Sequence, residues 1–445
     1  PGEPVMNRIH LRRLGLAAAA LGLLCLALVT FLRLQGARDL ERAARDFEAA
    51  VGPLELAAYR PPPAPAAENA AAAIEEAVEL LEATAADREQ PAAPADLRAL
   101  NRRPLAAWTG EDRERVRGLV QENARALTLL HRAARRPASS FDLDYAAGPT
   151  MPIPPLLPHL RAGDLLLAEA NLAWLEGRHE AGLAATEGLG AMGRALGREP
   201  PLVFQLFARW VERLHYRSIQ NVLALGGLDG PALRRLRGSG DPIPARNRFL
   251  GVLGAEAALL YSIRPGGPAV GTASDGFDEL PYRWLGHGYV ARSLEYYQRL
   301  GEAFPSASFA ALRTRPELVP PEASPLLPGT VSHFAFDWRG VIGGFKADES
   351  IAGLARLALA VALEGVASGS YPASLAGVGD SGADPFTGSG VRYERRADGS
   401  AVLSVPGAEE LWREIDRRTV REDGEAPLFT WELAPPSGAP VAGGS

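Results

Sequence analysis

Uncharged residues fill the chain from Leu14 to Leu32, and this run is the strongest feature of its hydrophobic pattern. At 1.5 Å per residue, a helix of these 19 residues measures about 28 Å, close to the hydrocarbon core of a bilayer. Three arginines precede the run within residues 1–13, which favours a cytoplasmic N-terminus and export of the bulk of the chain. The pattern therefore predicts a single-pass transmembrane signal anchor.

A cleavable signal peptide is the alternative for the same run. Signal peptides usually have an apolar region of about 7–15 residues that ends at an A-x-A-like site. Here the run is longer, and residues 33–38, Arg-Leu-Gln-Gly-Ala-Arg, match such a site poorly. A lipoprotein site at Cys25 would need a small residue where Leu23 and Leu24 stand. We therefore predict an uncleaved anchor in the lipid bilayer of the bacterial inner membrane, with an extracytoplasmic bulk.

An amphipathic stripe follows the anchor, with Leu40, Ala44, Phe47 and Val51 at helical spacing. This stripe either pairs with a second copy of the chain or docks on the chain's own domain, which is the commoner use of so short a stripe. Residues 33–65 end in the proline run RPPPAP and are predicted to form a juxtamembrane helix and a stiff spacer.

Helical periodicity dominates residues 66–345, for which we predict an irregular α-helical extracytoplasmic domain. Thr109 and Asp112 have the spacing of a capping box. The turn around Gly177 resembles a tetratricopeptide-type hairpin, although a solenoid would need at least about three such units. Helices are expected over residues 67–85, 110–135, 160–176, 179–196, 202–225 and 246–263.

The pattern changes over residues 346–434, where a small α+β module is predicted. Asp348 is placed to cap a helix from about Glu349 to Ala367, which is apolar nearly all round and must be covered on several sides. Strands are expected at residues 391–396, 401–405 and 428–433, with a hairpin turn at Ala397-Asp398-Gly399-Ser400. The fold class is thus mainly α, ending in a helix plus a three-stranded antiparallel sheet, and residues 435–445 are expected to be a disordered tail.

Three motifs in this module carry a resemblance: residues 369–375 (GSYPASL), 384–388 (DPFTG) and 391–393 (VRY). Together with the preceding helix they resemble the C-terminal part of type II secretion major pseudopilins. Residues 65–70 (PAAENA), after an anchor and a proline run, are similar to a broad group of uncharacterised single-pass bacterial membrane-anchored proteins. No prepilin peptidase site stands near Leu14, so the resemblance implies the shape of the module and not a secretion role.

Composition narrows the classes of function. The chain has 47 basic and 53 acidic residues and a net charge of −6, which argues against binding to nucleic acid. A single cysteine excludes an internal disulfide framework and a CxxC-type metal or redox site. None of the seven histidines stands three or four residues from another, so we predict no metal site and no cofactor. Calcium binding by the acidic residues at 409–423 stays open.

Two short motifs copy catalytic or cofactor sites without their context. Residues 379–382 read GDSG, as around a chymotrypsin-like serine, but the triad also needs a histidine and an aspartate, and His333 has no matching context. Gly188, Gly190 and Gly193 satisfy G-x-G-x-x-G inside a helical segment and not after a strand, which favours close helix packing. No catalytic residue is assigned.

Glu169 and Glu256 stand in strongly apolar helices and are the candidate buried polar or ligand positions. A buried carboxylate is costly unless it is paired, so the structural interpretation is an arginine–glutamate clamp between helices. The functional interpretation is a general acid or a ligand-binding anchor. A separate mixture of aromatic residues and arginine suits either a partner surface or the edge of a core, and comprises Tyr289, Tyr296, Tyr297, Trp338 and Arg339.

Three hypotheses of function result. The first is a membrane-anchored binding or scaffold protein of the bacterial cell envelope that has envelope protein partners or self-associates. The second is an envelope hydrolase with a cleft near Glu256. The third is a pseudopilin-like accessory component of a secretion system.

Overall fold

The computed structural model describes residues 8–86, 94–239, 243–265, 267, 280–320, 338–379, 382–419 and 428–436. The chain is mostly helical, with a small antiparallel sheet near its C-terminus. The helices are α1 (Arg8–Ala50), α2 (Ala70–Ala86), α3 (Pro94–Arg102), α4 (Gly110–Glu122), α5 (Ala124–Ala134), α6 (Leu157–Leu175), α7 (His179–Gly197), α8 (Leu202–Leu225), α9 (Gly230–Ser239), α10 (Ala245–Ser262), α11 (Leu280–Ala303), α12 (Phe309–Leu312), α14 (Trp338–Ser368) and α15 (Ala408–Thr419). The strands are β1 (Arg392–Arg395), β2 (Ala401–Ser404) and β3 (Thr430–Leu433).

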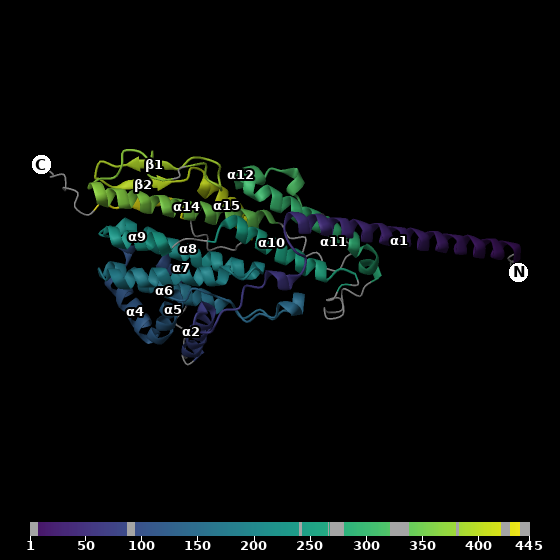
Figure 1. Cartoon of the computed structure of the whole chain (residues 1–445), viewed down its shortest axis with the longest axis horizontal. Coiled ribbons are helices and arrows are strands. Elements are labelled where there is room, and N and C mark those ends of the chain that lie inside the picture. Colours follow the sequence, from purple (N-terminus) through teal and green to yellow (C-terminus); the bar gives the residue numbers. More distant parts are fainter. Residues whose placement is uncertain are drawn as a thin grey trace, which may run out of the picture.

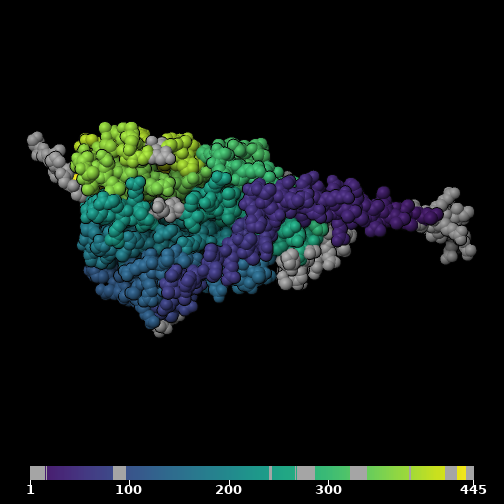
Figure 2. All heavy atoms as spheres, in the orientation of Figure 1, coloured from purple at the N-terminus to yellow at the C-terminus, as the bar shows by residue number. Residues whose placement is uncertain are grey.

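Helix α1 is continuous through the apolar run and into the body of the protein. Its outer part projects beyond the body as a rod (Figures 1 and 2), and leucines there, such as Leu21 and Leu24, are 62% and 66% exposed. Its inner part packs along α11, where Leu40 and Phe47 are buried. The prediction that the amphipathic stripe docks on the chain's own domain is confirmed.

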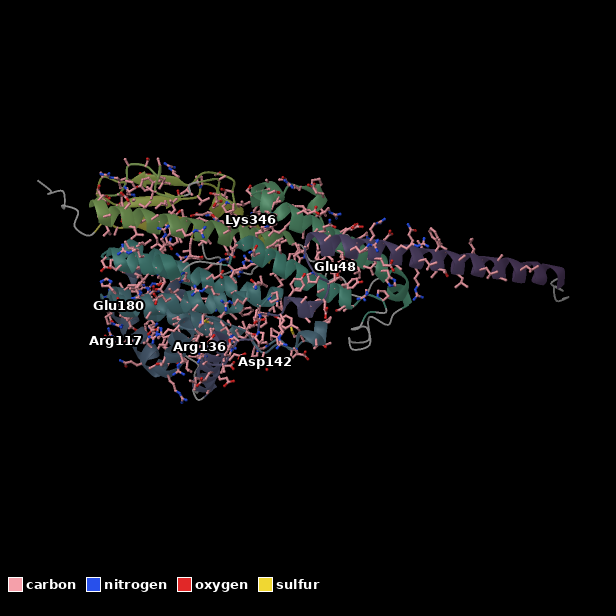
Figure 3. All side chains as sticks on the ribbon, viewed as in Figure 1. Glu48, Arg117, Arg136, Asp142, Glu180 and Lys346 are labelled. Atoms are coloured by element: carbon pink, nitrogen blue, oxygen red, sulfur yellow. The ribbon has the colours of Figure 1, made fainter. Side chains whose placement is uncertain are left out.

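Small residues let α1 and α11 approach closely. A Cβ atom on Gly36 would lie 3.2 Å from the backbone nitrogen of Gly288, and one on Gly301 would lie 3.1 Å from a Val51 methyl group. Because the contacts advance in the same direction along both helices, α1 and α11 run parallel. The carbon-rich side chains of the outer α1 contrast with the charged side chains over the body (Figure 3).

The central helices form layers in which α8 packs on α7 and α6, and α5 and α2 lie beneath (Figure 1). The bounds of α8 are those predicted, and α6, α7 and α10 begin and end within a few residues of expectation. Thr109 and Asp112 make the predicted capping box at the start of α4. The helix expected over residues 110–135 is interrupted at Asn123, which separates α4 from α5.

The C-terminal module contains the predicted hairpin and third strand. Tyr393 of β1 pairs with Leu403 of β2, which pairs with Trp431 of β3, and all contacts are antiparallel. Helix α14 covers this sheet, but it begins at Trp338 and not near Glu349. Asp348 therefore lies inside the helix and does not cap it, and α15 was not predicted.

The core does not divide between the helical region and the C-terminal module. The larger of two apolar clusters runs from the inner part of α1 and α11 through α8 and α10 to α14 and the sheet. The smaller lies among α2, α5, α6, α7 and α8. Pro436, which we expected in the tail, is buried, and residues 437–445 lie outside the described part of the chain.

Two helices, the apolar part of α1 and α14, are long and apolar enough to cross a membrane by length and composition alone. In α14, 61% of the most apolar window is buried inside the protein, as in a core helix. In α1 none of that window is buried. The N-terminal helix is thus a candidate membrane anchor or signal sequence.

Candidate binding site

A pocket of about 460 Å³ lies where α14 meets α9 and two described loop segments, residues 378–379 and 382–391. This volume is within the range of small-molecule sites, about 300–1,000 Å³. Its apolar lining comes from α14 and from the loop, and comprises Leu354, Leu357, Ala360, Val378, Pro385 and Val391. The sequence did not reveal this pocket, because its lining residue on α9, Arg237, stands more than 100 residues before the first one on α14, Glu349.

Two arginines line the pocket, Arg237 from α9 and Arg356 from α14, and both are exposed. Neither forms an ion pair with another residue of the described ranges, whereas many other arginines of the chain do. Glu349 also lines the pocket, and its carboxylate lies 3.3 Å from the Lys346 ammonium group. The two guanidinium groups are therefore available to a bound anion.

Asp384 holds the loop against α14. Its buried carboxylate accepts hydrogen bonds from the Ser350 hydroxyl group, from the backbone N–H groups of Phe386 and Thr387 at 3.0 and 2.7 Å, and from the Thr387 hydroxyl group at 3.1 Å. These four donors satisfy the carboxylate. The role of Asp384 is therefore to fix the wall of the pocket and not to meet a ligand.

Gly353 also lines the pocket, in the interior of α14. Glycine inside a helix is less stable than alanine by about 1 kcal/mol. A Cβ atom on Gly353 would meet nothing within 4 Å. Close packing therefore does not explain this glycine, and its position leaves the space of the pocket open.

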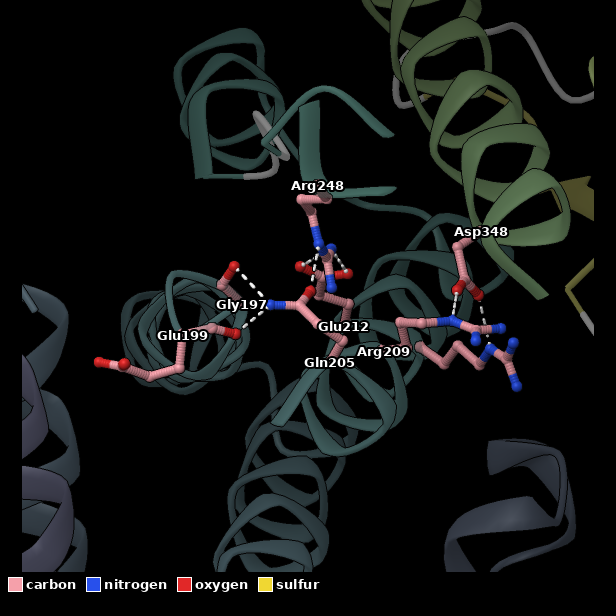
Figure 4. Close-up of polar contacts among 8 residues, drawn as sticks. Gly197, Glu199, Gln205, Arg209, Glu212, Arg248 and Asp348 are labelled. Carbon is pink, nitrogen blue, oxygen red and sulfur yellow. Dashed lines mark hydrogen bonds and ion pairs between the residues drawn. The ribbon is translucent and has the colours of Figure 1, made fainter. Parts of the chain in front are cut away.

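A buried ionic network connects α8 to α10 and α14 (Figure 4). Arg248 of α10 donates to both Glu212 oxygens at 2.7 and 2.6 Å and to the Gln205 side chain at 2.9 Å. Asp348 of α14 accepts hydrogen bonds from Arg209 and Arg213 of α8. Burial opposes ionisation of Asp348, but the two arginines outweigh it and lower the pKa of this carboxyl. The network links helices and does not line the pocket.

Glu169 and Glu256 do not form the predicted clamps with arginine. Glu169 lies 3.0 Å from Nε2 of His131, across from α6 to α5. Glu256 accepts a hydrogen bond of 3.0 Å from the backbone N–H of Leu202, the first residue of α8. Burial raises the pKa of Glu256, against the effect of this N–H donor. The clamps that the structure contains use Glu212 and Asp348 instead.

The four aromatic residues for which a partner surface or the edge of a core was expected lie in the core. Tyr289, Tyr296, Tyr297 and Trp338 are at most 1% exposed. The Tyr297 and Trp338 rings meet edge to face, with centroids 5.4 Å apart. Arg339, which follows Trp338, is half-buried. These aromatic rings therefore form a helix-packing core and not a partner surface, because α10, α11 and α14 cover them.

Other candidate motifs have structural explanations or fall outside the described residues. Gly188, Gly190 and Gly193 lie inside α7, and a Cβ on Gly193 would lie 2.7 Å from Glu212, which supports the packing interpretation. Asp380 and Ser381 of the GDSG motif, and His333, are outside the described ranges. Among the described side chains, no group of three or more histidine, cysteine or acidic residues is arranged to hold a metal ion.

No protein family, curated protein or solved structure matches the chain. The function must therefore be inferred from the geometry of the chain itself.

Proposed function

We propose that this protein is a membrane-anchored, extracytoplasmic binding or scaffold protein of the bacterial cell envelope. The observation that carries the proposal is the single helix α1, which is apolar and exposed in its outer part and buried against α11 in its inner part. An exposed apolar surface of this length is unfavourable in water and favourable in a bilayer. The arginines at 8, 12 and 13 favour a cytoplasmic N-terminus in the inner membrane.

The continuous helix also argues against a cleaved signal peptide. Residues 33–38, where a signal peptidase would cut, are helical, and Gly36 is buried against Gly288. An uncleaved helix would join the membrane directly to the body, since α1 is continuous from its outer part to Phe47.

The binding role rests on the pocket between α9, α14 and the loop residues 378–379 and 382–391. Its lining combines apolar side chains with charged ones, among them two arginines without ion pairs in the described structure. The tetratricopeptide-like hairpin of α6 and α7 would add a surface for envelope protein partners or for self-association.

The two alternatives receive less support. A hydrolase with a cleft at Glu256 would need an accessible carboxyl, but Glu256 is half-buried and its carboxylate accepts a hydrogen bond from the N-terminus of α8. A pseudopilin-like component rests on the motifs of residues 369–393 alone, and the apolar helix next to them, α14, packs in the core.

Membrane fractionation with an alkaline wash tests the anchor. We expect the chain to stay in the membrane pellet at its full mass. Changing both Leu21 and Leu24 to Arg is expected to release it, because a charged side chain at the centre of a span costs about 3 kcal/mol. Val319→Arg, at an apolar position on the body that is 52% exposed, is the matched control and should stay in the pellet. A shortened, soluble chain would favour the signal peptide and contradict the proposal.

A further inference from the structure

Gly353 differs from Gly343, Gly344 and Gly365, which also lie in α14. Side chains on Gly343, Gly344 and Gly365 would clash with Ile415, Arg209 and Tyr371, so close packing requires those glycines. No such neighbour faces Gly353, although the helix would be more stable with a larger residue there. Gly353 therefore makes the helix less stable than a larger residue would, and its one visible effect is to leave the pocket unfilled.

The charged groups around the pocket differ in whether they already have partners. The carboxylate of Asp384 is satisfied by four donors, and Glu349 lies beside Lys346. Arg237 and Arg356 have no ion pair among the described residues. Arginine binds carboxylates through paired, planar hydrogen bonds. The groups that are free to act are therefore both cationic donors.

We infer that the pocket binds a small organic carboxylate, with the anionic group at Arg237 and Arg356 and an apolar portion over Leu354, Leu357 and Gly353. A single negative charge fits better than two, because Glu349 and Asp384 also line the pocket and would repel a dianion. This inference rests on the proposed binding function and specifies its ligand class.

Calorimetric titration of the full chain in lipid nanodiscs tests the inference, with 4-phenylbutanoate as the probe. The neutral 4-phenylbutanol and the cationic 4-phenylbutylamine are matched in shape. We expect the carboxylate to bind and the other two to bind at least about tenfold more weakly, because each loses charge-assisted hydrogen bonds. Arg237→Gln and Arg356→Gln, at exposed positions where folding is not at stake, should each weaken binding of the carboxylate about tenfold.

Gly353→Leu tests the location. We expect it to abolish binding of 4-phenylbutanoate while leaving the melting temperature unchanged or higher, because it fills open space in a helix. Gly118→Leu is the matched control: Gly118 lies inside α4, away from the pocket, and a Cβ there also meets nothing within 4 Å. This variant should bind as the unaltered chain does.

Three results would overturn the inference: no binding of 4-phenylbutanoate, equal binding of the three probes, or unchanged binding by Gly353→Leu. Loss of binding in Gly353→Leu but in neither arginine variant would overturn the assignment of a carboxylate. A chain that fails to bind any probe but remains in the membrane after the alkaline wash refutes the ligand class and leaves the proposed anchor standing.

Discussion

Arg248 and Glu212 show how single residues join the helices. Their side chains are 5% and 9% exposed, so each charge depends on the other for solvation. Removing one partner of such a pair typically costs about 3–5 kcal/mol, because the remaining charge stays buried. We therefore expect Arg248→Met to lower the free energy of unfolding by about that amount, measured by urea titration in detergent.

The matched control is Arg313→Met. Arg313 pairs with Glu414 at the surface, where the side chains are 37% and 52% exposed. Such a pair contributes no more than about 1 kcal/mol. Equal losses of stability in the two variants would contradict the view that burial determines the importance of the Arg248–Glu212 pair.

Because His159 and His215 are buried, we expect the protein to lose stability in acid. Burial lowers the pKa of His159 and of His215 to about 4, and the charge of Arg194 adds to the effect on His215. The unfolded chain binds these protons at a pKa of about 6.5, so stability is complete above that pH and decreases as the pH falls toward 4. The expected loss by pH 5 is on the order of 2 kcal/mol for each histidine.

Melting temperatures measured between pH 7.5 and pH 5 test whether stability falls with the pH. His215→Gln should lose less stability on acidification than the unaltered chain. His131→Gln should lose more: burial opposes protonation of His131, but the hydrogen bond and charge of Glu169 outweigh it and raise its pKa, so protonated His131 stabilises the fold at low pH. The same pH dependence in both variants would show that neither histidine titrates as its surroundings imply.

At the scale of elements, the α1–α11 contact makes α1 part of the body. A side chain at Gly36 would meet the backbone of Gly288, so Gly36→Leu must push the two helices apart. Overpacking of this kind costs about 1–3 kcal/mol, and we expect a lower melting temperature in detergent.

Gly22→Leu provides the comparison on the same helix. Gly22 lies in the exposed apolar part of α1, and a Cβ there meets nothing within 4 Å. The melting temperature should therefore not change. An equal effect of both substitutions would mean that α1 does not pack on α11 as described.

Local periodicity predicted most of the elements, because apolar spacing and glycine or proline breaks are visible within one segment. The bounds of α8 and the strands of the hairpin are examples. Asp348 shows the limit: next to an apolar run it was interpreted as a helix cap, but its partners Arg209 and Arg213 stand 139 and 135 residues away. The start of α14 and the pocket beside α9 depend on equally distant contacts, so the sequence could not place them.

The aromatic residues show the same limit for the candidate site. Tyr296 and Tyr297 beside arginines have the composition of an interface, and composition does not distinguish an interface from a core. Their burial depends on the way α11 packs against α10 and α14. Glu256 likewise accepts a hydrogen bond from the N-terminal N–H group of α8 and does not pair with an arginine, since a helix terminus is an alternative partner for a buried acid.

The whole molecule combines an exposed apolar rod with a body whose core is continuous from α1 to the C-terminal sheet. The apolar residues beside the pocket and those on the inner part of α1 belong to this one core. We propose above all that the outer part of α1 spans the inner membrane and leaves the body outside the cytoplasm.

Cys25, the only cysteine, makes this claim directly measurable by labelling spheroplasts with a membrane-impermeant maleimide. We expect that Cys25 stays unlabelled until detergent dissolves the membrane. In a Cys25→Ala background, Asp46→Cys on the exposed face of α1 should be labelled in intact spheroplasts, and Asn7→Cys only after lysis. Labelling of Cys25 in intact membranes would contradict a membrane-spanning α1. Labelling of Asn7→Cys from outside would contradict a cytoplasmic N-terminus.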